Sequence, residues 1–229
     1  VRTMSRSLEV IRRRADMVIC SSEATRRDLL DQRIEDTRIR VVPLGVDVVD
    51  VPPSSVDRVR RHHDLPDEFV LFVGTVEPRK NLARLAEAME SVDLPLVIAG
   101  ADGWGDDRPV AGDDLRFGGF VPDRELTALY RAATVFAYPS VREGFGLPVA
   151  EAMAQGAAVV TSRGTSTEEV AGGAAVLVDP HDVADIARGI GEALDRRAEL
   201  AGLGRSRVSA LTWGAAAART VDVYREVVA

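Results

Sequence analysis

The chain has 229 residues, of which 46% are hydrophobic and 28% charged, so it can bury a substantial core in one or two domains of ordinary globular composition. The formal net charge of −7 argues against nucleic acid as a partner, and no apolar run approaches the roughly 20 residues that span a bilayer. Cys20 is the only cysteine, which excludes an internal disulfide and fits a reducing compartment.

The first 46 residues predict a small α/β unit that belongs to the end of a domain. Its expected elements are a helix at 2–14, a strand at 16–20, a helix from the Ser22 cap to Leu30 and a strand at 39–42. The chain starts at Val1, on a helix typical of the middle of a fold, so we expect it to lack most of an N-terminal domain. Residues 47–55, which include Pro52 and Pro53, are the expected linker.

Residues 56–212 alternate apolar strands with amphipathic helices, a pattern that predicts a Rossmann-like parallel sheet with helices on both faces. Strands are expected at 69–73, 96–99, 115–117, 135–137, 158–161 and 175–178. Helices are expected at 82–90, 123–132, 147–155, 166–171, 182–195 and 197–210, and residues 213–229 hold a final helix. Ligands in such sheets bind beyond the carboxyl ends of the strands.

Two carboxylates, Glu143 and Glu151, flank a turn that contains Gly144 and Gly146 and leads into a helix expected to begin at Leu147. Glycines let a backbone approach a ligand closely, and the free N–H groups of a helix start can hold an anion. Glu151 lies one helical turn, about 5.4 Å, from that start. The spacing suits a nucleotide sugar, with phosphate at the helix start, ribose on Glu151 and the sugar on Glu143.

Lys80 is the single lysine among 29 basic residues, and it lies beside Arg79 in a loop after an apolar strand. A compact ammonium retained among so many arginines indicates a position where guanidinium does not fit, and phosphate contact meets that requirement. The alternatives to phosphate contact are that Lys80 is a surface lysine retained by chance and that Arg79 pairs with Glu77.

Several further stretches occur in the order and spacing of one family. From residue 15 to the C-terminus, the chain resembles the retaining glycosyltransferases of family four, whose two Rossmann-like domains face a cleft. The resemblance rests on Glu143 and Glu151, which fit the family's paired-glutamate signature, and on residues 15–22, 41–47, 73–81, 117–123 and 176–180.

The resemblance implies that residues 56–212 bind the nucleotide sugar and that residues 213–229 cross back onto the N-terminal domain. The implied donor contacts are Gly74, Thr75, Arg79, Lys80, Phe120, Val121, Glu143, Gly144, Phe145, Gly146, Leu147 and Glu151. Catalytic roles fall to Glu143, which stabilises a charged sugar, and to Arg79 and Lys80, which neutralise the leaving diphosphate. Thr75 stands where many relatives have an arginine, so this clamp is one cation short.

The implied reaction is metal-independent transfer of a hexose, with retention, from a nucleotide diphosphate sugar to a glycan or lipid-linked acceptor held by the N-terminal domain. Residues 73–82 resemble the mannosyltransferase-like branch that builds polysaccharides, which favours GDP-mannose. No cofactor is implied. We expect a cytoplasmic protein, at the inner face of the membrane through peripheral association, and an inactive chain when it is alone.

Other functions stay open at this point. A nucleotide-sugar 2-epimerase or a non-catalytic nucleotide-sugar-binding module fits the same architecture, whereas residues 73–78 lack the glycine pattern of NAD-binding domains. His62 and His63 suggest a metal, but no cysteine, third histidine or paired carboxylate lies at ligand spacing, so we expect none. Residues 101–114 are expected to form a loop over the site rather than a calcium loop.

Overall fold

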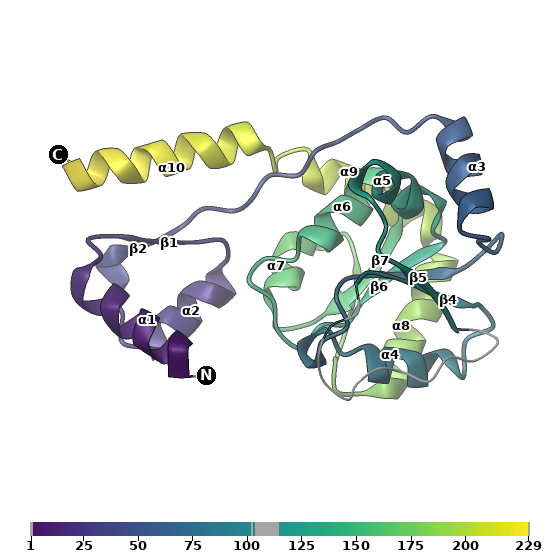
Figure 1. The fold of residues 1–229 in the computed structure, drawn as a ribbon, viewed down its shortest axis with the longest axis horizontal. Helices are drawn as coiled ribbons and strands as arrows, with labels where there is room; N and C mark the ends of the chain where they lie inside the picture. The colour runs from purple at the N-terminus through teal and green to yellow at the C-terminus, as the bar shows by residue number, and fades with distance from the viewer. Residues whose placement is uncertain (1, 102, 104–114, 229) are drawn as a thin grey trace.

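The computed structural model describes residues 2–101, 103 and 115–228, and Figure 1 shows their arrangement. A larger α/β body contains most of the helices, and a smaller N-terminal unit lies beside it under a long C-terminal helix. The loop expected over the site, at 101–114, lies almost wholly outside the described residues. None of the described helices has the length and apolar character needed to cross a bilayer.

The large body is built on a six-stranded sheet in the order β5-β4-β3-β6-β7-β8, with every neighbouring pair parallel. Its strands are β3 (Val70–Val73), β4 (Leu96–Ala99), β5 (Leu115–Gly119), β6 (Val135–Tyr138), β7 (Ala158–Ser162) and β8 (Val176–Val178). This is the strand order of a doubly wound Rossmann fold, and the order reverses between β3 and β6. Loops that follow these two central strands therefore meet at the switch point, where such folds bind ligands.

Helices cover both faces of the sheet, which explains why its central strands are continuous apolar runs. One face carries α4 (Leu82–Met89) and α8 (Val183–Asp195), which pack on each other. The opposite face carries α3 (Pro53–His62), α5 (Asp123–Ala132), α6 (Leu147–Gln155) and α9 (Arg197–Val208). The short helix α7 (Ser166–Ala171) contacts α6 and β7.

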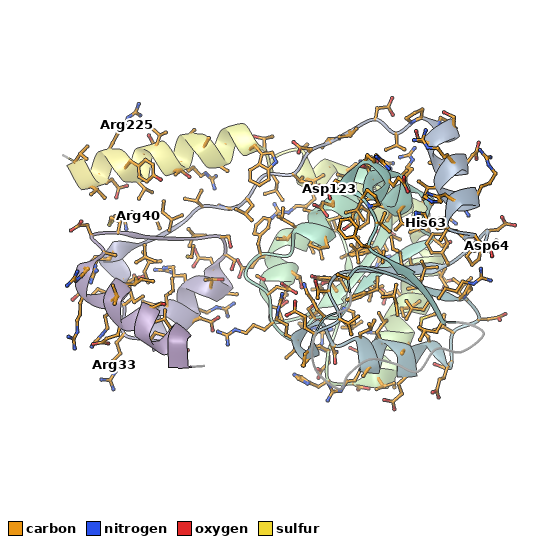
Figure 2. All side chains as sticks on the ribbon, in the orientation of Figure 1. Arg33, Arg40, His63, Asp64, Asp123 and Arg225 are labelled. Atoms are coloured by element: carbon orange, nitrogen blue, oxygen red, sulfur yellow. The ribbon has the colours of Figure 1, made fainter. Side chains whose placement is uncertain are left out.

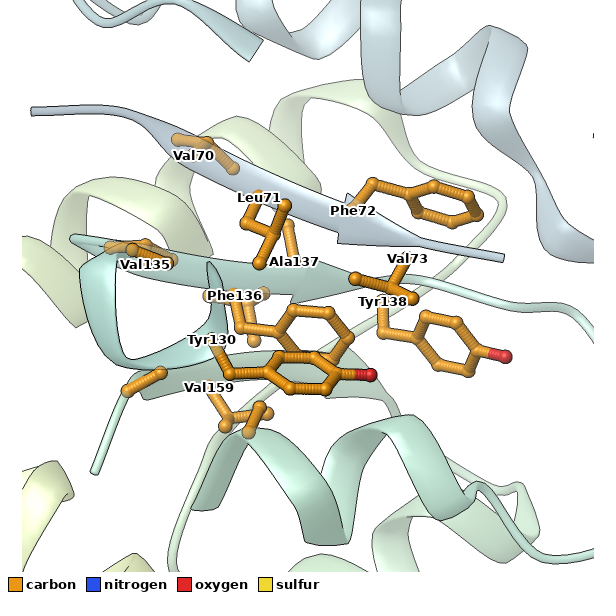
Figure 3. Close-up of a cluster of buried hydrophobic side chains, with 14 of the residues drawn as sticks. Val70, Leu71, Phe72, Val73, Tyr130, Val135, Phe136, Ala137, Tyr138 and Val159 are labelled. Carbon is orange, nitrogen blue, oxygen red and sulfur yellow. The ribbon is translucent and has the colours of Figure 1, made fainter. Parts of the chain in front are cut away.

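A row of aromatic rings fills the centre of the core (Figure 3). Phe72, Tyr138 and Phe136 stack in sequence with ring centroids 5.7 Å apart, and Tyr130 meets Phe136 edge-on at 5.4 Å. Each such contact contributes about 0.5–1.5 kcal/mol beyond burial. The hydroxyl groups of Tyr130 and Tyr138 point the same way along the strands, so the core delivers two polar groups towards the carboxyl edge of the sheet.

The N-terminal unit consists of α1 (Arg2–Arg14), β1 (Val18–Cys20), α2 (Glu23–Asp31), a 3₁₀ turn η1 (Asp36–Arg38) and β2 (Ile39–Val41). The two strands pair in parallel over a small core of Cys20, Ile34 and Ile39. The final helix, α10 (Trp213–Val228), returns to this unit, where Ala216 and Val223 pack with Val42. The C-terminal helix therefore packs on the N-terminal unit.

The outgoing and returning segments cross at Gly45 and Trp213. The Val46 N–H donates to the Leu211 carbonyl at 2.9 Å, and a Cβ added to Gly45 would lie 2.2 Å from the Trp213 nitrogen. Just beyond, α3 begins at Pro53, inside the segment expected to be linker. Both prolines were expected to lie in the linker, but Pro53 occupies the first turn of α3, where proline is favoured.

Candidate functional site

Lys80 is held at the switch point by the short turn that follows β3. This turn, η2 (Pro78–Lys80), ends at Asn81 in a left-handed conformation with φ 62°. The Asn81 side-chain amide donates to the carbonyls of Pro139, after β6, and Pro180, after β8, at 2.9 and 2.6 Å. Asn81 therefore ties three loops together and fixes the residue before it.

The ammonium of Lys80 is buried against Glu143. Each of the two side chains is only 9% exposed, and Lys80 Nζ lies 2.6 Å from Glu143 Oε1. Lys80 also donates to the Tyr138 hydroxyl, which in turn donates to Glu143 at 3.0 Å. Burial lowers the pKa of Lys80, opposed by its hydrogen bond to Glu143, and burial raises the pKa of Tyr138. A cation in such a low-dielectric place can stabilise phosphate charge more strongly than it could in water.

Arg79 adds a second cation to Glu143 from the solvent side. Its guanidinium lies 2.7 Å from Glu143 Oε2 and 2.9 Å from Glu77, and its side chain is 43% exposed. The pairing with Glu77 considered from the sequence therefore exists beside the one with Glu143. The structure thus brings the three residues expected to be catalytic into one hydrogen-bonded group.

The turn between Glu143 and α6 contacts the N-terminal unit. Gly146 is the N-cap of α6 at φ 105°, and a Cβ there would lie 2.7 Å from Thr167 Cγ2. The carbonyl of Gly144 accepts hydrogen bonds from three hydroxyls at the start of α2, those of Ser21, Ser22 and Thr25. Phe145 is buried beside the same segment. Donor contact by Gly144 and Phe145 stays a prediction.

Glu151 opens onto a separate cavity of about 330 Å³. The Tyr130 hydroxyl donates to its carboxylate at 2.8 Å, and burial raises the pKa of Glu151. Leu147 from the first turn of α6 lines this cavity too, together with Asp47, Asp123, Thr127 and Trp213. The volume is at the lower end of the range for small-molecule sites and suits a nucleoside.

The remaining expected contacts lie at the ends of β3 and β5. Gly74 follows β3 with φ 155°, a backbone conformation that favours glycine, and its Cα lies beside the Lys80 side chain. Thr75 is partly exposed beside it. Phe120 is 73% exposed, whereas the next residue, Val121, is buried just before α5. An exposed ring at this edge is available to stack on a base.

Sequence reasoning missed Tyr130 and Tyr138. The signal for Tyr138 was present, because it ends a strand five residues before Glu143. The pairing of Tyr130 with Glu151 depends on how α5 packs against α6 and has no local sequence signal.

The interpretation of His62 and His63 also changes. We expected no metal because no third ligand lay at ligand spacing. The structure brings Glu125 of α5 to 3.1 Å from both rings, so helix packing supplies a third possible ligand that sequence spacing did not reveal.

Two family models match the chain: Glycosyl transferases group 1 over residues 55–206 and Glycosyltransferase Family 4 over residues 2–50. The chain belongs to the group 1 glycosyl transferases. Among curated proteins, this glycosyl transferase chain is 32% identical to O-antigen chain mannosyltransferase B of Escherichia coli, over 98% of this chain and 64% of that protein. It is also 32% identical to MMP alpha-(1->4)-mannosyltransferase of Mycolicibacterium hassiacum, over 96% of this chain and 56% of that protein. The chain therefore spans less than two thirds of the length of these relatives.

Solved structures show the same architecture. Sucrose-phosphate synthase from Thermosynechococcus elongatus superposes with a TM-score of 0.82 at 27% identity, over 99% of this chain and 62% of that one. HepE of Anabaena in complex with UDP-glucose superposes with a TM-score of 0.87 at 18% identity, over 98% of this chain and 68% of that one. The expected fold class, a Rossmann-like parallel sheet with helices on both faces, is confirmed.

Proposed function

We propose that the protein transfers a hexose, with mannose favoured, from a nucleotide diphosphate sugar to an acceptor. The observation that carries the proposal is the buried Lys80–Glu143 pair at the β3/β6 switch point. A buried ion pair is costly to build, so its place at the ligand-binding edge favours a functional role.

The donor then spans two neighbouring sites on either side of the start of α6. The nucleoside occupies the cavity beside Glu151, with its ribose on that carboxylate and its base near Phe120 and Val121. The diphosphate lies against Arg79 and Lys80 and the Leu147 N–H at the start of α6, and the sugar faces Glu143. Leu147 lines the nucleoside cavity from that same helix turn, which supports this continuity.

The charges that develop during the reaction explain the roles of Arg79, Lys80 and Glu143. As the bond between sugar and diphosphate breaks, negative charge grows on the leaving oxygen and positive charge on the sugar. Arg79 and Lys80 stabilise the first, and Glu143 stabilises the second. Because two side-chain cations supply this charge, no metal ion is needed to bind the donor. Retention follows from front-face attack assisted by the diphosphate.

The sugar and the pathway class rest on the relatives' names. Both curated mannosyltransferases cover nearly the whole chain, and one of them is named for O-antigen chains. We infer GDP-mannose as donor and a glycan or lipid-linked acceptor in polysaccharide synthesis, at the cytoplasmic face of the membrane.

Calorimetric titration of the chain with GDP, UDP and ADP, each with and without EDTA, tests the donor site. We expect GDP to bind most tightly and EDTA to leave its affinity unchanged. Loss of GDP binding in EDTA that added Mg²⁺ restores would overturn the metal-free arrangement, and failure of all three nucleotides to bind would overturn the donor site itself.

A further inference from the structure

A cluster of three metal-ligating side chains lies outside the donor site, where α3 meets α5. His62 is the last residue of α3, His63 is its C-cap, and Glu125 lies in the first turn of α5. His62 Nδ1 and His63 Nε2 each lie 3.1 Å from the same carboxylate oxygen, Glu125 Oε2. The ligand atoms of the three residues all lie within 4.8 Å of one another.

The surroundings of the cluster leave one side open to solvent. The side chains of Glu125 and His63 are 10% and 14% exposed, whereas that of His62 is 64% exposed. A competing cation is Arg124, whose Nε lies 3.6 Å from the other oxygen, Oε1, and whose side chain is 81% exposed. Glu125 therefore turns one oxygen towards a solvated guanidinium and the other towards the two imidazoles.

We propose that His62, His63 and Glu125 bind a zinc ion that joins α3 to α5. Zinc bonds of about 2.0 Å in a tetrahedral site place its ligand atoms about 3.3 Å apart, so the two 3.1 Å separations already approach that geometry. Two imidazoles and one carboxylate suit zinc and its neighbours in the transition series rather than magnesium or calcium. Water from the open side at His62 completes the coordination.

The site lies at one end of the contact between α3 and α5. α3 packs on α5, and Figure 2 labels His63 near the end of α3. At the other end of α5, the Arg60 guanidinium donates to the Ala132 carbonyl at 2.8 Å. A zinc ion at the histidines fixes the start of α5, the helix that carries Asp123 and Tyr130 of the nucleoside cavity. The ion thus has a structural role and takes no part in the transfer reaction.

The chain is well suited to a test because it contains three histidines and one cysteine, and Cys20 is buried. Metal-freed protein is titrated with ZnCl₂ by calorimetry, and with Co²⁺ while visible absorption is recorded. We expect one equivalent of Zn²⁺ to bind, the melting temperature to rise with ZnCl₂, and Co²⁺ to give the intense bands of tetrahedral coordination.

The variants His62→Ala, His63→Ala and Glu125→Gln should each bind Zn²⁺ at least about tenfold more weakly. His181→Ala, which removes the remaining, exposed histidine, is the matched control and should bind like the unmodified chain. Equal zinc affinity in the control and the three ligand variants would overturn the proposal. If a variant fails to fold, measurements on the unmodified chain still test the proposal. Calorimetry that detects no Zn²⁺ binding, or a Co²⁺ complex that shows only the weak absorption of octahedral coordination, would overturn the proposal.

Discussion

Replacing Lys80 by methionine removes the buried ammonium but keeps an unbranched side chain. In the free protein, Glu143 retains Arg79 at 2.7 Å and the Tyr138 hydroxyl at 3.0 Å, so the chain should still fold. A hydrogen bond to a charged group contributes about 1.5–3 kcal/mol, which corresponds to a roughly tenfold to hundredfold loss of GDP affinity. Guanosine, which has no phosphate, should bind the variant and the unmodified chain equally.

Calorimetric titration of both proteins with GDP and guanosine measures this difference directly. Arg197→Met is the control, because it removes a surface cation that is 53% exposed and pairs only loosely with Glu68, at 3.3 Å. Its GDP affinity should be unchanged. If Lys80→Met binds GDP as tightly as the control, with circular dichroism showing both folded, Lys80 is not a phosphate ligand.

Three other substitutions test the rest of the account. Glu151→Gln should weaken GDP binding by about 1–3 kcal/mol. Because burial raises the pKa of Glu151, this group contributes stability to the folded chain only at low pH, and that stability is lost as pH rises through the folded pKa. Glu151→Gln should therefore melt at a higher temperature than the unmodified chain at pH 7, and the difference should vanish in acid. Equal melting temperatures at pH 7 would contradict the burial argument. Glu143→Gln should leave GDP affinity intact and abolish transfer from GDP-mannose in an active protein. A loss of GDP affinity as large as that of Glu151→Gln would show that the two carboxylates are wrongly assigned. Gly45→Ala should destabilise the fold by about 1–3 kcal/mol in urea, since its Cβ would lie 2.2 Å from the Trp213 nitrogen, and an unchanged midpoint would refute the tight crossing.

Most of the fold could be predicted because its elements have strong local signals. α6 begins and ends where the sequence predicts, since Gly146 precedes it, Pro148 lies in its first turn and Gly156 ends it in a left-handed conformation. α3 could not be predicted in the same way. Its start coincides with a pair of prolines, which are equally typical of a linker and of a helix start. The packing of α3 against α5, which the sequence does not show, distinguishes the two.

The site could be predicted as a set of residues but not as a network. The rarity of lysine singled out Lys80 and the spacing of carboxylates singled out Glu143, and the structure joins them at 2.6 Å. Their shared contact with Tyr138 depends on the end of β6 lying beside the loop after β3. The approach of Glu125 to the two histidines likewise depends on the packing of two helices, for which sequence spacing gives no signal.

Because Lys80 is the only lysine, a protein labelled with ¹⁵N-lysine gives one backbone amide signal, and that signal reports on the proposed diphosphate site alone. Titration with GDP-mannose should move this signal progressively to a new position at one equivalent, and guanosine should leave it nearly in place. A lysine signal that stays fixed while calorimetry shows GDP-mannose saturating the chain would contradict the assignment of the diphosphate to Lys80, and with it the central claim that this edge of the sheet holds the sugar donor.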